Sequence, residues 1–263
     1  MATNIQSYSN SGAGFNALTA EQAEFYQRAM LERLLPNLFF MKYGTKKNIP
    51  KNNGDTTSFR RLNSLNVATT ALTEGVTPDA VDLNISKITA TVKQYGAWTK
   101  LTDFIQLVGL DPLLTEVSQL MGENAAESMD IIVRDIIAAG TNVLYANGKL
   151  SRDTVADKIN ATDIIKMRKI MKTNKVKEIS LPGGGKGYIA FAHPSVISDL
   201  MTTQEWKDQN TYVNTKNREQ GIAGQMYGIY FMEAVNAPKW AGAGAASADV
   251  YGTLVIGDGA YGI

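Results

Sequence analysis

Cysteine is absent from this 263-residue chain, and histidine occurs only once, as His193. Without cysteine the chain has neither disulfide bonds nor thiolate metal ligands, and a zinc site would need several carboxylates beside the single histidine. A Ser-His-Asp triad would have to use His193, yet the sequence contains no G-x-S-x-G nucleophile elbow. We therefore expect no catalytic residue, no metal site and no cofactor. His193 precedes Pro194 and is interpreted as a turn or helix-cap residue.

Long apolar runs and an excess of charge are also missing. No stretch approaches the ~20 consecutive apolar residues that a membrane-spanning helix needs. Residues 1–16 are polar and lack the apolar core of a secretory signal, so we expect a soluble protein that is intracellular when made. The net charge is only +1, from 26 basic and 25 acidic residues, which argues against a dedicated nucleic-acid-binding protein with a strong global field.

The chain does contain a long amphipathic segment at residues 111–140. Asp111 and Pro112 suit the first positions of a helix, and Gly140 is where a left-handed C-cap would fall. Such a helix would be about 42 Å long at 1.5 Å per residue, so other elements must cover its apolar face. The apolar residues that recur at helical spacing are Leu113, Val117, Leu120, Met121, Ala125, Met129, Ile132, Val133, Ile136 and Ile137.

A two-stranded ribbon is predicted before this helix. Residues 57–62 and 88–93 favour strands, the second with clear alternation, and residues 66–83 form an extended excursion between them. An isolated ribbon of this kind is marginal in water, so we expect the segment from about 55 to 100 to lie on another subunit. A shorter helix is predicted at residues 18–35, after a flexible arm.

A second unit of mixed helices and strands is predicted at residues 158–256, after a connector at 141–157. The overall class is therefore α+β, with 44% hydrophobic residues to supply a core. Within this unit we expect helices at 163–173 and 195–207, strands at 188–192, 227–234 and 251–256, and loops at 204–220 and 241–248.

Two glycine-rich stretches invite a nucleotide-binding interpretation. Residues 257–262 match G-x-G-x-x-G, but a dinucleotide site also needs a following helix and parallel strand. Residues 183–187 place Lys186 after glycines, yet Gly187 stands where the phosphate loop has serine or threonine. We interpret both as turns and keep a nucleotide-binding enzyme only as a remote alternative.

Charged residues supply the remaining candidates. Glu123, Glu127 and Asp130 could form a carboxylate cluster, but a solvated or subunit-facing stripe is favoured, with Asp130 and Arg134 as an i,i+4 ion pair. A basic run could contact another subunit, remain solvated or touch phosphates, with subunit contact favoured. Its members are Lys42, Lys46, Lys47, Lys51, Arg60 and Arg61.

An ordered series of segments resembles a known family. The segments are TALTEGVTP at 70–78, ITATVKQYG at 88–96, RDIIAAGTNV at 134–143, IAFAHP at 189–194 and APKWAG at 237–242. They resemble the major capsid proteins of tailed phages, within the N4-type podophage subgroup. The resemblance spans roughly residues 18–262, and no single motif in it is catalytic.

The resemblance implies a Hong Kong 97-like capsid fold. It implies an N-terminal arm at 1–36, a linker at 37–54, an extended β-ribbon loop at 55–100, a peripheral domain at 101–157 with its spine helix at 111–140, an axial domain at 158–256 and a return at 257–263. Relatives continue beyond the position of Ile263, so the edge of the sheet beside the spine is in question. No lysine-asparagine crosslinking motif can be carried over.

The function implied is that of a major capsid protein, not an enzyme, which self-assembles into hexamers and pentamers of an icosahedral head around double-stranded DNA. Expected partners are further copies of the chain, portal, scaffolding or decoration proteins, and DNA contacted non-specifically, in a virion assembled in the host cytoplasm without a membrane. An encapsulin-like compartment is the alternative with the same fold. The intersubunit contact candidates are Lys42, Lys46, Lys47, Lys51, Arg60, Arg61, Glu74, Glu123, Glu127, Asp130 and Arg134.

Overall fold

The chain divides into two compact units, which are described separately. One comprises Met1–Gly44 with Ala97–Tyr261, and the other Thr45–Gly96 with Gly262–Ile263. The computed structural model describes residues 20–34, 38–52, 54–62, 65, 67, 69, 71, 74, 75, 77, 80–100, 113–181, 185–210 and 221–263.

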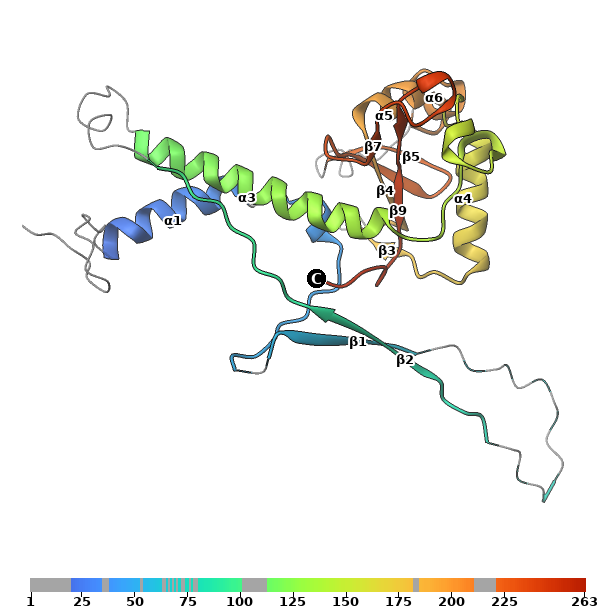
Figure 1. Cartoon of the computed structure of the whole chain (residues 1–263). Helices are drawn as coiled ribbons and strands as arrows, with labels where there is room; N and C mark the ends of the chain where they lie inside the picture. Colours follow the sequence, from blue (N-terminus) through green and yellow to red (C-terminus); the bar gives the residue numbers. More distant parts are fainter. Residues whose placement is uncertain are drawn as a thin grey trace, which may run out of the picture. The chain divides into compact units, whose positions relative to one another are not determined.

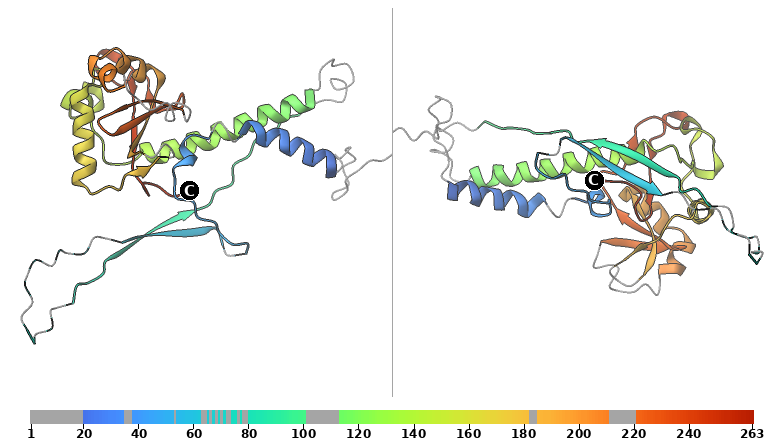
Figure 2. Two further views of the ribbon diagram at one scale, coloured as in Figure 1. Left: turned by 180° about the vertical axis from the view of Figure 1, so that it is seen from behind. Right: turned by 90° about the horizontal axis from the view of Figure 1, so that it is seen from below.

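The long predicted helix is confirmed as α3, Leu113–Ala138. The second predicted helix is α1, Ala20–Leu34, and it runs beside α3 in every view (Figures 1 and 2). The expected caps Asp111 and Pro112 lie outside the described residues. The left-handed C-cap at Gly140 is wrong, because Gly140 has no positive φ and its N–H donates to the carbonyl of Ile137 in a tightened last turn.

The crossing of α1 and α3 is close because Gly122 lies at it. A Cβ on Gly122 would collide with the Met30 carbonyl oxygen of α1 and stand 3.1 Å from Met30 Cγ. Ala126, one turn later on α3, is fully buried, and Ala29 of α1 is buried as well. Small side chains at these positions let the two backbones approach.

A sheet of five strands forms the core of the larger unit. Four of its strands lie in the order β3 (Ile179–Ser180), β4 (Lys186–Ala192), β6 (Ile229–Glu233) and β5 (Ile222–Met226). The fifth strand, β9 (Leu254–Ile256), pairs with the same edge of β4 as β3 does. β4 and β6 are parallel, and the other pairs are antiparallel. β4 is buried on both faces, which explains its unbroken apolar run and confirms the strand predicted at 188–192.

Two apolar clusters cover the two faces of this sheet. On one face Ile189 and Phe191 of β4 pack with Phe40 of the 3₁₀ helix η2 (Phe40–Lys42), and Val133 and Ile137 of α3 join them. Phe40 and Phe191 lie with ring centroids 4.7 Å apart. β4 therefore packs against both η2 and α3 on this face of the sheet.

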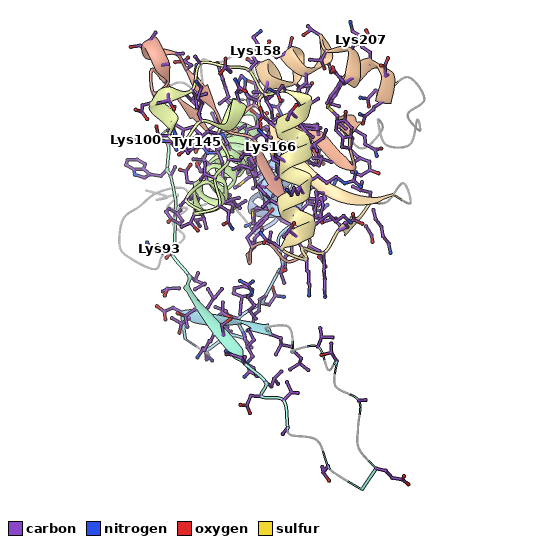
Figure 3. The ribbon with its side chains drawn as sticks, turned by 90° about the vertical axis from the view of Figure 1, so that its right-hand side faces the viewer. Lys93, Lys100, Tyr145, Lys158, Lys166 and Lys207 are labelled. Carbon is purple, nitrogen blue, oxygen red and sulfur yellow. The ribbon has the colours of Figure 1, made fainter. Side chains whose placement is uncertain are left out.

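The opposite face is covered by three helices. They are α4 (Ala161–Thr173), α5 (Pro194–Met201) and α6 (Gln204–Asn210), which contribute Ile164, Leu200 and Trp206 to the second cluster. Figure 3 faces α4, whose predicted position is confirmed.

The helix predicted at 195–207 is two helices, so that expectation is wrong. The hydroxyls of Thr202 and Thr203 donate to the carbonyls of Asp199 and Leu200 at 2.6 Å, where they compete with helical hydrogen bonds and the first helix ends. The loop expected from 204 is likewise wrong up to Asn210, because α6 occupies it; residues 211–220 lie outside the described residues.

The strands expected at 227–234 and 251–256 are shorter and more numerous. A turn at Tyr227 and Gly228, both with positive φ, joins β5 to β6, and β5 was not predicted. The second segment is interrupted after β8 (Val250–Tyr251), which pairs with β7 (Lys239–Trp240), and resumes as β9. The connector at 141–157 holds only 3₁₀ turns, η3 (Ala146–Gly148) and η4 (Arg152–Thr154), and the loop at 241–248 holds η5 (Ala245–Ser247).

The smaller unit is built on the predicted ribbon. β1 (Thr56–Leu62) and β2 (Ile85–Thr91) pair antiparallel over their whole length, from Thr56 with Thr91 to Leu62 with Ile85 (Figure 1). Both predicted strands are confirmed, although β2 begins three residues before the expected position. Of the 18 residues of the excursion expected at 66–83, eight lie outside the described residues.

Candidate assembly surfaces

The ribbon exposes side chains on both of its faces. Ile88 of β2 is 59% exposed, and Leu62 and Ile85, the last register pair, are exposed as well. Phe59 and Ile88 are paired on one face, while Arg60 and Lys87 are paired on the other. Thr57, Ser58 and Phe59 of β1 are half-buried, whereas every residue of β2 except Ser86 is exposed, so the ribbon lacks the burial that stabilises larger sheets. Its surface is therefore available to another molecule.

One end of the ribbon is tied to residues of its own unit. The N–H of Lys47 donates to the carbonyl of Ile263 at 2.9 Å, and Thr45 forms a parallel bridge with Gly262. The Lys47 ammonium donates to the carbonyl of Ser58 and lies 5.7 Å from the centre of the Phe59 ring. A Cβ on Gly262 would collide with that ring, so the close approach requires glycine.

Arg60 and Lys87 are directly opposite in the register, which places two like charges side by side. Such cross-strand pairs are destabilising unless an anion lies nearby. No carboxylate forms an ion pair with either residue within the described ranges. An anionic group from outside the ribbon would therefore relieve the repulsion between Arg60 and Lys87.

The basic run does not form one patch within a compact unit. Lys46, Lys47, Lys51, Arg60 and Arg61 are exposed and belong to the ribbon unit. Lys42 belongs to the larger unit, in η2, and its ammonium lies 5.6 Å from the centre of the Tyr43 ring. Glu74 is also exposed. Contact of these residues with another subunit stays a prediction.

The carboxylates of α3 have separate environments instead of forming one cluster. Glu123 accepts from Arg33 of α1 at 2.9 Å and joins the two helices, whereas Glu127 is exposed. Arg134 pairs with Asp135 at 2.7 Å and donates to the Asn236 carbonyl, so the expected Asp130–Arg134 pair is replaced.

Asp130 is completely buried, so the solvated stripe is wrong at this position. Its Oδ1 accepts the N–H of Phe40 at 2.9 Å. Burial raises the pKa of Asp130, while the N–H groups of residues 39–41 and the Arg134 charge act in the opposite direction. Beside it, Tyr261 donates to the Phe40 carbonyl, and burial together with the Asp130 charge raises the pKa of the Tyr261 phenol. This buried group anchors η2 and the segment after β9 to α3.

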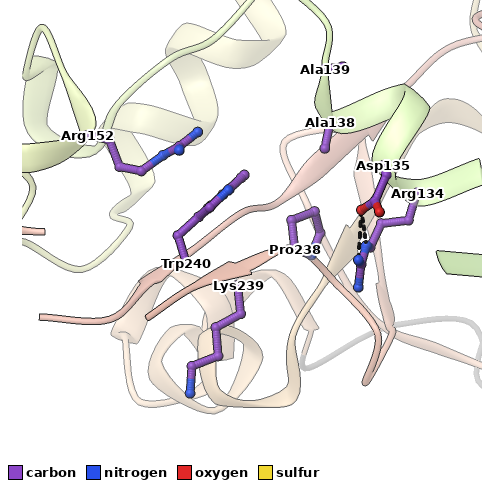
Figure 4. A pocket seen from close by; sticks show the side chains of 8 residues that line it. All are labelled: Arg134, Asp135, Ala138, Ala139, Arg152, Pro238, Lys239 and Trp240. Carbon is purple, nitrogen blue, oxygen red and sulfur yellow. Dashed lines mark hydrogen bonds and ion pairs between the residues drawn. The ribbon is translucent and has the colours of Figure 1, made fainter. Parts of the chain in front are cut away.

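A pocket of about 330 Å³ lies between the end of α3 and β7 (Figure 4). The guanidinium carbon of Arg152 is 3.8 Å from the centre of the Trp240 ring, a cation–π geometry. Lys239 forms a 2.8 Å ion pair with Asp249, whose pKa is lowered by hydrogen bonds from Lys239 and from the Gly242 N–H. Three cations, Arg134, Arg152 and Lys239, thus line this pocket together with one carboxylate, Asp135, which pairs with Arg134.

Two of the motifs that suggested enzymes, at His193 and at residues 257–262, have structural roles. His193 caps α5, since its Nδ1 accepts the N–H of Ser195 at 3.2 Å, as predicted, and its ring packs on Tyr251. Residues 257–262 contain a turn with Gly259 at positive φ, as predicted. Residues 182–184 lie outside the described residues, and the turn predicted at 183–187 is wrong at Lys186 and Gly187, because these residues begin β4 and pair with β3.

In the described ranges, histidine and carboxylate side chains form no group of three able to hold a metal ion. Among those same residues, no helix has the length and apolarity needed to cross a membrane.

Comparison with known proteins decides the family. Residues 85–261, two thirds of the chain, match the family described as phage capsid protein. The chain belongs to that family. No curated protein sequence matches it.

Solved phage capsids share the fold of this capsid protein. The capsid of Ralstonia phage GP4 superposes with a TM-score of 0.65 at 14% identity, over 82% of this chain and 72% of that one. The capsid of Cyanophage P-SCSP1u superposes with a TM-score of 0.53 at 13% identity, over 77% of this chain and 64% of that one. The mature capsid of bacteriophage PhiM1 superposes with a TM-score of 0.51 at 20% identity, over 80% of this chain and 67% of that one. The capsid protein therefore spans about two thirds of the length of these relatives.

These matches are consistent with a Hong Kong 97-like fold of mixed helices and strands. The protein is a major capsid protein of a bacteriophage, a structural component of the virion capsid. Neither an encapsulin-like compartment nor a nucleotide-binding enzyme is favoured by them.

Reasoning from the sequence missed the role of Asp130 and the basic pocket at Trp240. Asp130 was placed on a polar stripe because it follows Glu123 and Glu127 at helical spacing. The neighbouring apolar residues Met129, Ile132 and Val133 were a signal that this turn of α3 approaches the core. No local pattern connects Arg152 to Trp240, which are 88 positions apart.

Proposed function

We propose that the capsid protein self-assembles into hexamers and pentamers of an icosahedral shell that encloses double-stranded DNA. The observation that carries this proposal is the ribbon of β1 and β2, whose side chains are exposed on both faces in a member of a capsid family. Such a ribbon gains order when it lies on a neighbouring copy. Many modest contacts of this kind would act together, so the shell would be held by avidity.

The proposed assignment of segments to domains follows the Hong Kong 97-like fold. Residues 1–36 act as the arm, 37–54 as a linker and 55–100 as the extended loop. Residues 101–157 act as the peripheral domain around α3, 158–256 as the axial domain and 257–263 as the return. The nearly balanced net charge of +1 suits close packing of identical chains and a lining that holds DNA weakly.

The same proposal includes the finer assignments. The protein belongs to the N4-type podophage subgroup, acts without enzymatic chemistry and assembles in the host cytoplasm. Portal, scaffolding or decoration proteins would be its further partners, and DNA would be contacted without sequence preference. The exposed residues Lys46, Lys51, Arg60, Arg61 and Glu74 are proposed to contact neighbouring subunits, because each is exposed on the ribbon unit.

Electron microscopy of the full-length protein tests this function. We expect closed particles from the native chain and soluble subunits without particles when residues 66–83 are deleted. A matched control replaces the same residues with glycine and serine, which keeps the length of the connection but removes its side chains. Normal particles from both variants would contradict the role of the ribbon. Nuclease-resistant DNA in particles from infected cells would distinguish a phage head from a protein-filled compartment.

A further inference from the structure

The strongest concentration of positive charge lies on and just after α4. Residues 161–177 contain six basic residues and one acid, Asp163, which leaves +5 in a chain whose total is +1. Lys166 lies 3.6 Å from Asp163, and Lys172 forms a 2.6 Å pair with Glu178. The other four have no ion-pair partner within the described residues: Arg168, Lys169, Lys175 and Lys177, all exposed.

An apolar pocket of about 370 Å³ lies on the same helix. Its lining from α4 is Lys166, Lys169, Ile170 and Thr173, whose spacing places them on one face, and Leu144 and Asn174 complete it. Ile170 and Leu144 are 43% and 38% exposed. Figure 3 looks onto this helix, on which Lys166 is labelled. The surface therefore combines an apolar depression with cations beside it.

This combination fits a peptide better than a nucleic acid. Phosphates would pair with the lysines but would leave the apolar lining of Leu144 and Ile170 unfilled. A peptide that carries aliphatic side chains between carboxylates would satisfy both features. Among the acidic stretches of this chain, α3 has its Asp130 buried and its Glu123 paired with Arg33, so it has few free carboxylates to offer.

The chain contains such a peptide at the end of its ribbon. Residues 65–84 include Glu74, Asp79 and Asp82 and no basic residue. The described aliphatic side chains of this stretch, Val67 and Leu83 among them, are more than half exposed.

We propose that the basic face of α4, with its apolar pocket, binds residues 65–84 of a second copy of this chain. An aliphatic side chain of that segment fills the pocket between Leu144 and Ile170, and its carboxylates pair with Lys169 and neighbouring cations. This inference rests on the proposed assembly through the ribbon and names the surface that receives it.

A binding assay with the full-length protein tests the inference directly. The probe is a fluorescein-labelled peptide of residues 65–84, titrated at a protein concentration where light scattering shows no particles. We expect Lys169→Glu to weaken binding about fivefold or more, since it replaces an attraction with a repulsion. Ile170→Asn should weaken binding through the pocket, and both residues are exposed, so both variants should fold. Lys186→Glu, the same charge change at an exposed lysine of β4, is the matched control and should stay within twofold.

Two changes to conditions and probe sharpen the result. Binding should fall on raising NaCl from about 50 to 300 mM, because exposed charges are screened. A peptide with Glu74, Asp79 and Asp82 replaced by Gln, Asn and Asn should bind about tenfold more weakly. Binding no stronger than that of a scrambled peptide, or equal loss in Lys186→Glu, would overturn the inference. So would a short DNA duplex that binds through Lys169 while the peptide does not.

Assembly of whole particles separates this inference from the proposed function. Glu74→Lys should impair shell formation, and adding Lys169→Glu to it should restore particles in part. If the Lys169→Glu variant formed normal particles and the native protein did not bind the peptide, the role of the α4 surface would be refuted while the proposed function would stand. Absence of particles from the native chain under all conditions would refute the proposed function itself.

Discussion

The close crossing of α1 and α3 at Gly122 makes a quantitative prediction. In Gly122→Ala the added methyl would collide with the Met30 carbonyl oxygen and stand 3.1 Å from both the carbonyl carbon and Cγ of that residue. Carbon and a carbonyl oxygen ordinarily stay about 3.3 Å apart or more, so one helix must move. Overpacking of this kind costs about 1–3 kcal/mol. Alanine offsets about 1 kcal/mol of that cost through its higher helix propensity.

We therefore expect Gly122→Ala to lower the free energy of unfolding by up to about 2 kcal/mol, and Gly122→Val to lower it further because a β-branched residue adds two methyl groups and loses the propensity gain. Asn124→Ala is the control, since Asn124 is exposed on the same helix and alanine there should stabilise by about 0.5 kcal/mol.

Urea unfolding followed by circular dichroism measures these differences in the unassembled subunit. Limited trypsin digestion provides a local readout, because α1 contains Arg28 and Arg33 and a displaced α1 should be cleaved faster. If Gly122→Ala stabilised the protein by the full propensity gain and left cleavage of α1 unchanged, the crossing could not be as close as described.

Substitutions at three further residues test other contacts. Asp130→Ala should lower the free energy of unfolding by about 2 kcal/mol by leaving the Phe40 N–H unsatisfied, whereas Asp130→Asn keeps an acceptor and should cost less. Because the pKa of Asp130 is raised in the folded state, its contribution to stability is full below the unfolded pKa and is lost as pH rises through the folded pKa. Urea unfolding at several pH values should therefore show that the free energy of unfolding falls less with rising pH in Asp130→Asn than in the native protein. Gly262→Ala should push the Phe59 ring away and speed hydrogen exchange of the Lys47 amide, and unchanged exchange would contradict this contact. Gly224→Ala should cost about 1–3 kcal/mol in thermal or urea unfolding, because its Cβ would stand 2.9 Å from Trp206 Cη2.

Much of the fold was predictable because it is recorded in local periodicity. The apolar spacing along α3, the alternation in β2, the apolar run of β4 and the His193-Pro194 start of α5 each depend on neighbouring residues. The ends of elements were less predictable. Thr202 and Thr203 end α5 through hydroxyl hydrogen bonds that a hydrophobic pattern does not contain.

The candidate surfaces were predictable only in composition. The sequence identified the basic run, but the opposition of Arg60 and Lys87 depends on the register of the ribbon. The acids of α3 were visible as a stripe, but not that Glu123 pairs with Arg33 while Asp130 is buried against Phe40.

The sequence alone determined which segments become long helices and strands, because those choices depend on residues a few positions apart. It also determined, through ordered segments along the chain, the resemblance to phage capsid proteins. Only the tertiary structure decided which polar residues are buried, which helices cross closely and where cations gather without partners. Those outcomes depend on residues such as Met30 and Gly122, or Phe40 and Asp130, that lie about 90 positions apart and meet only when the chain has folded.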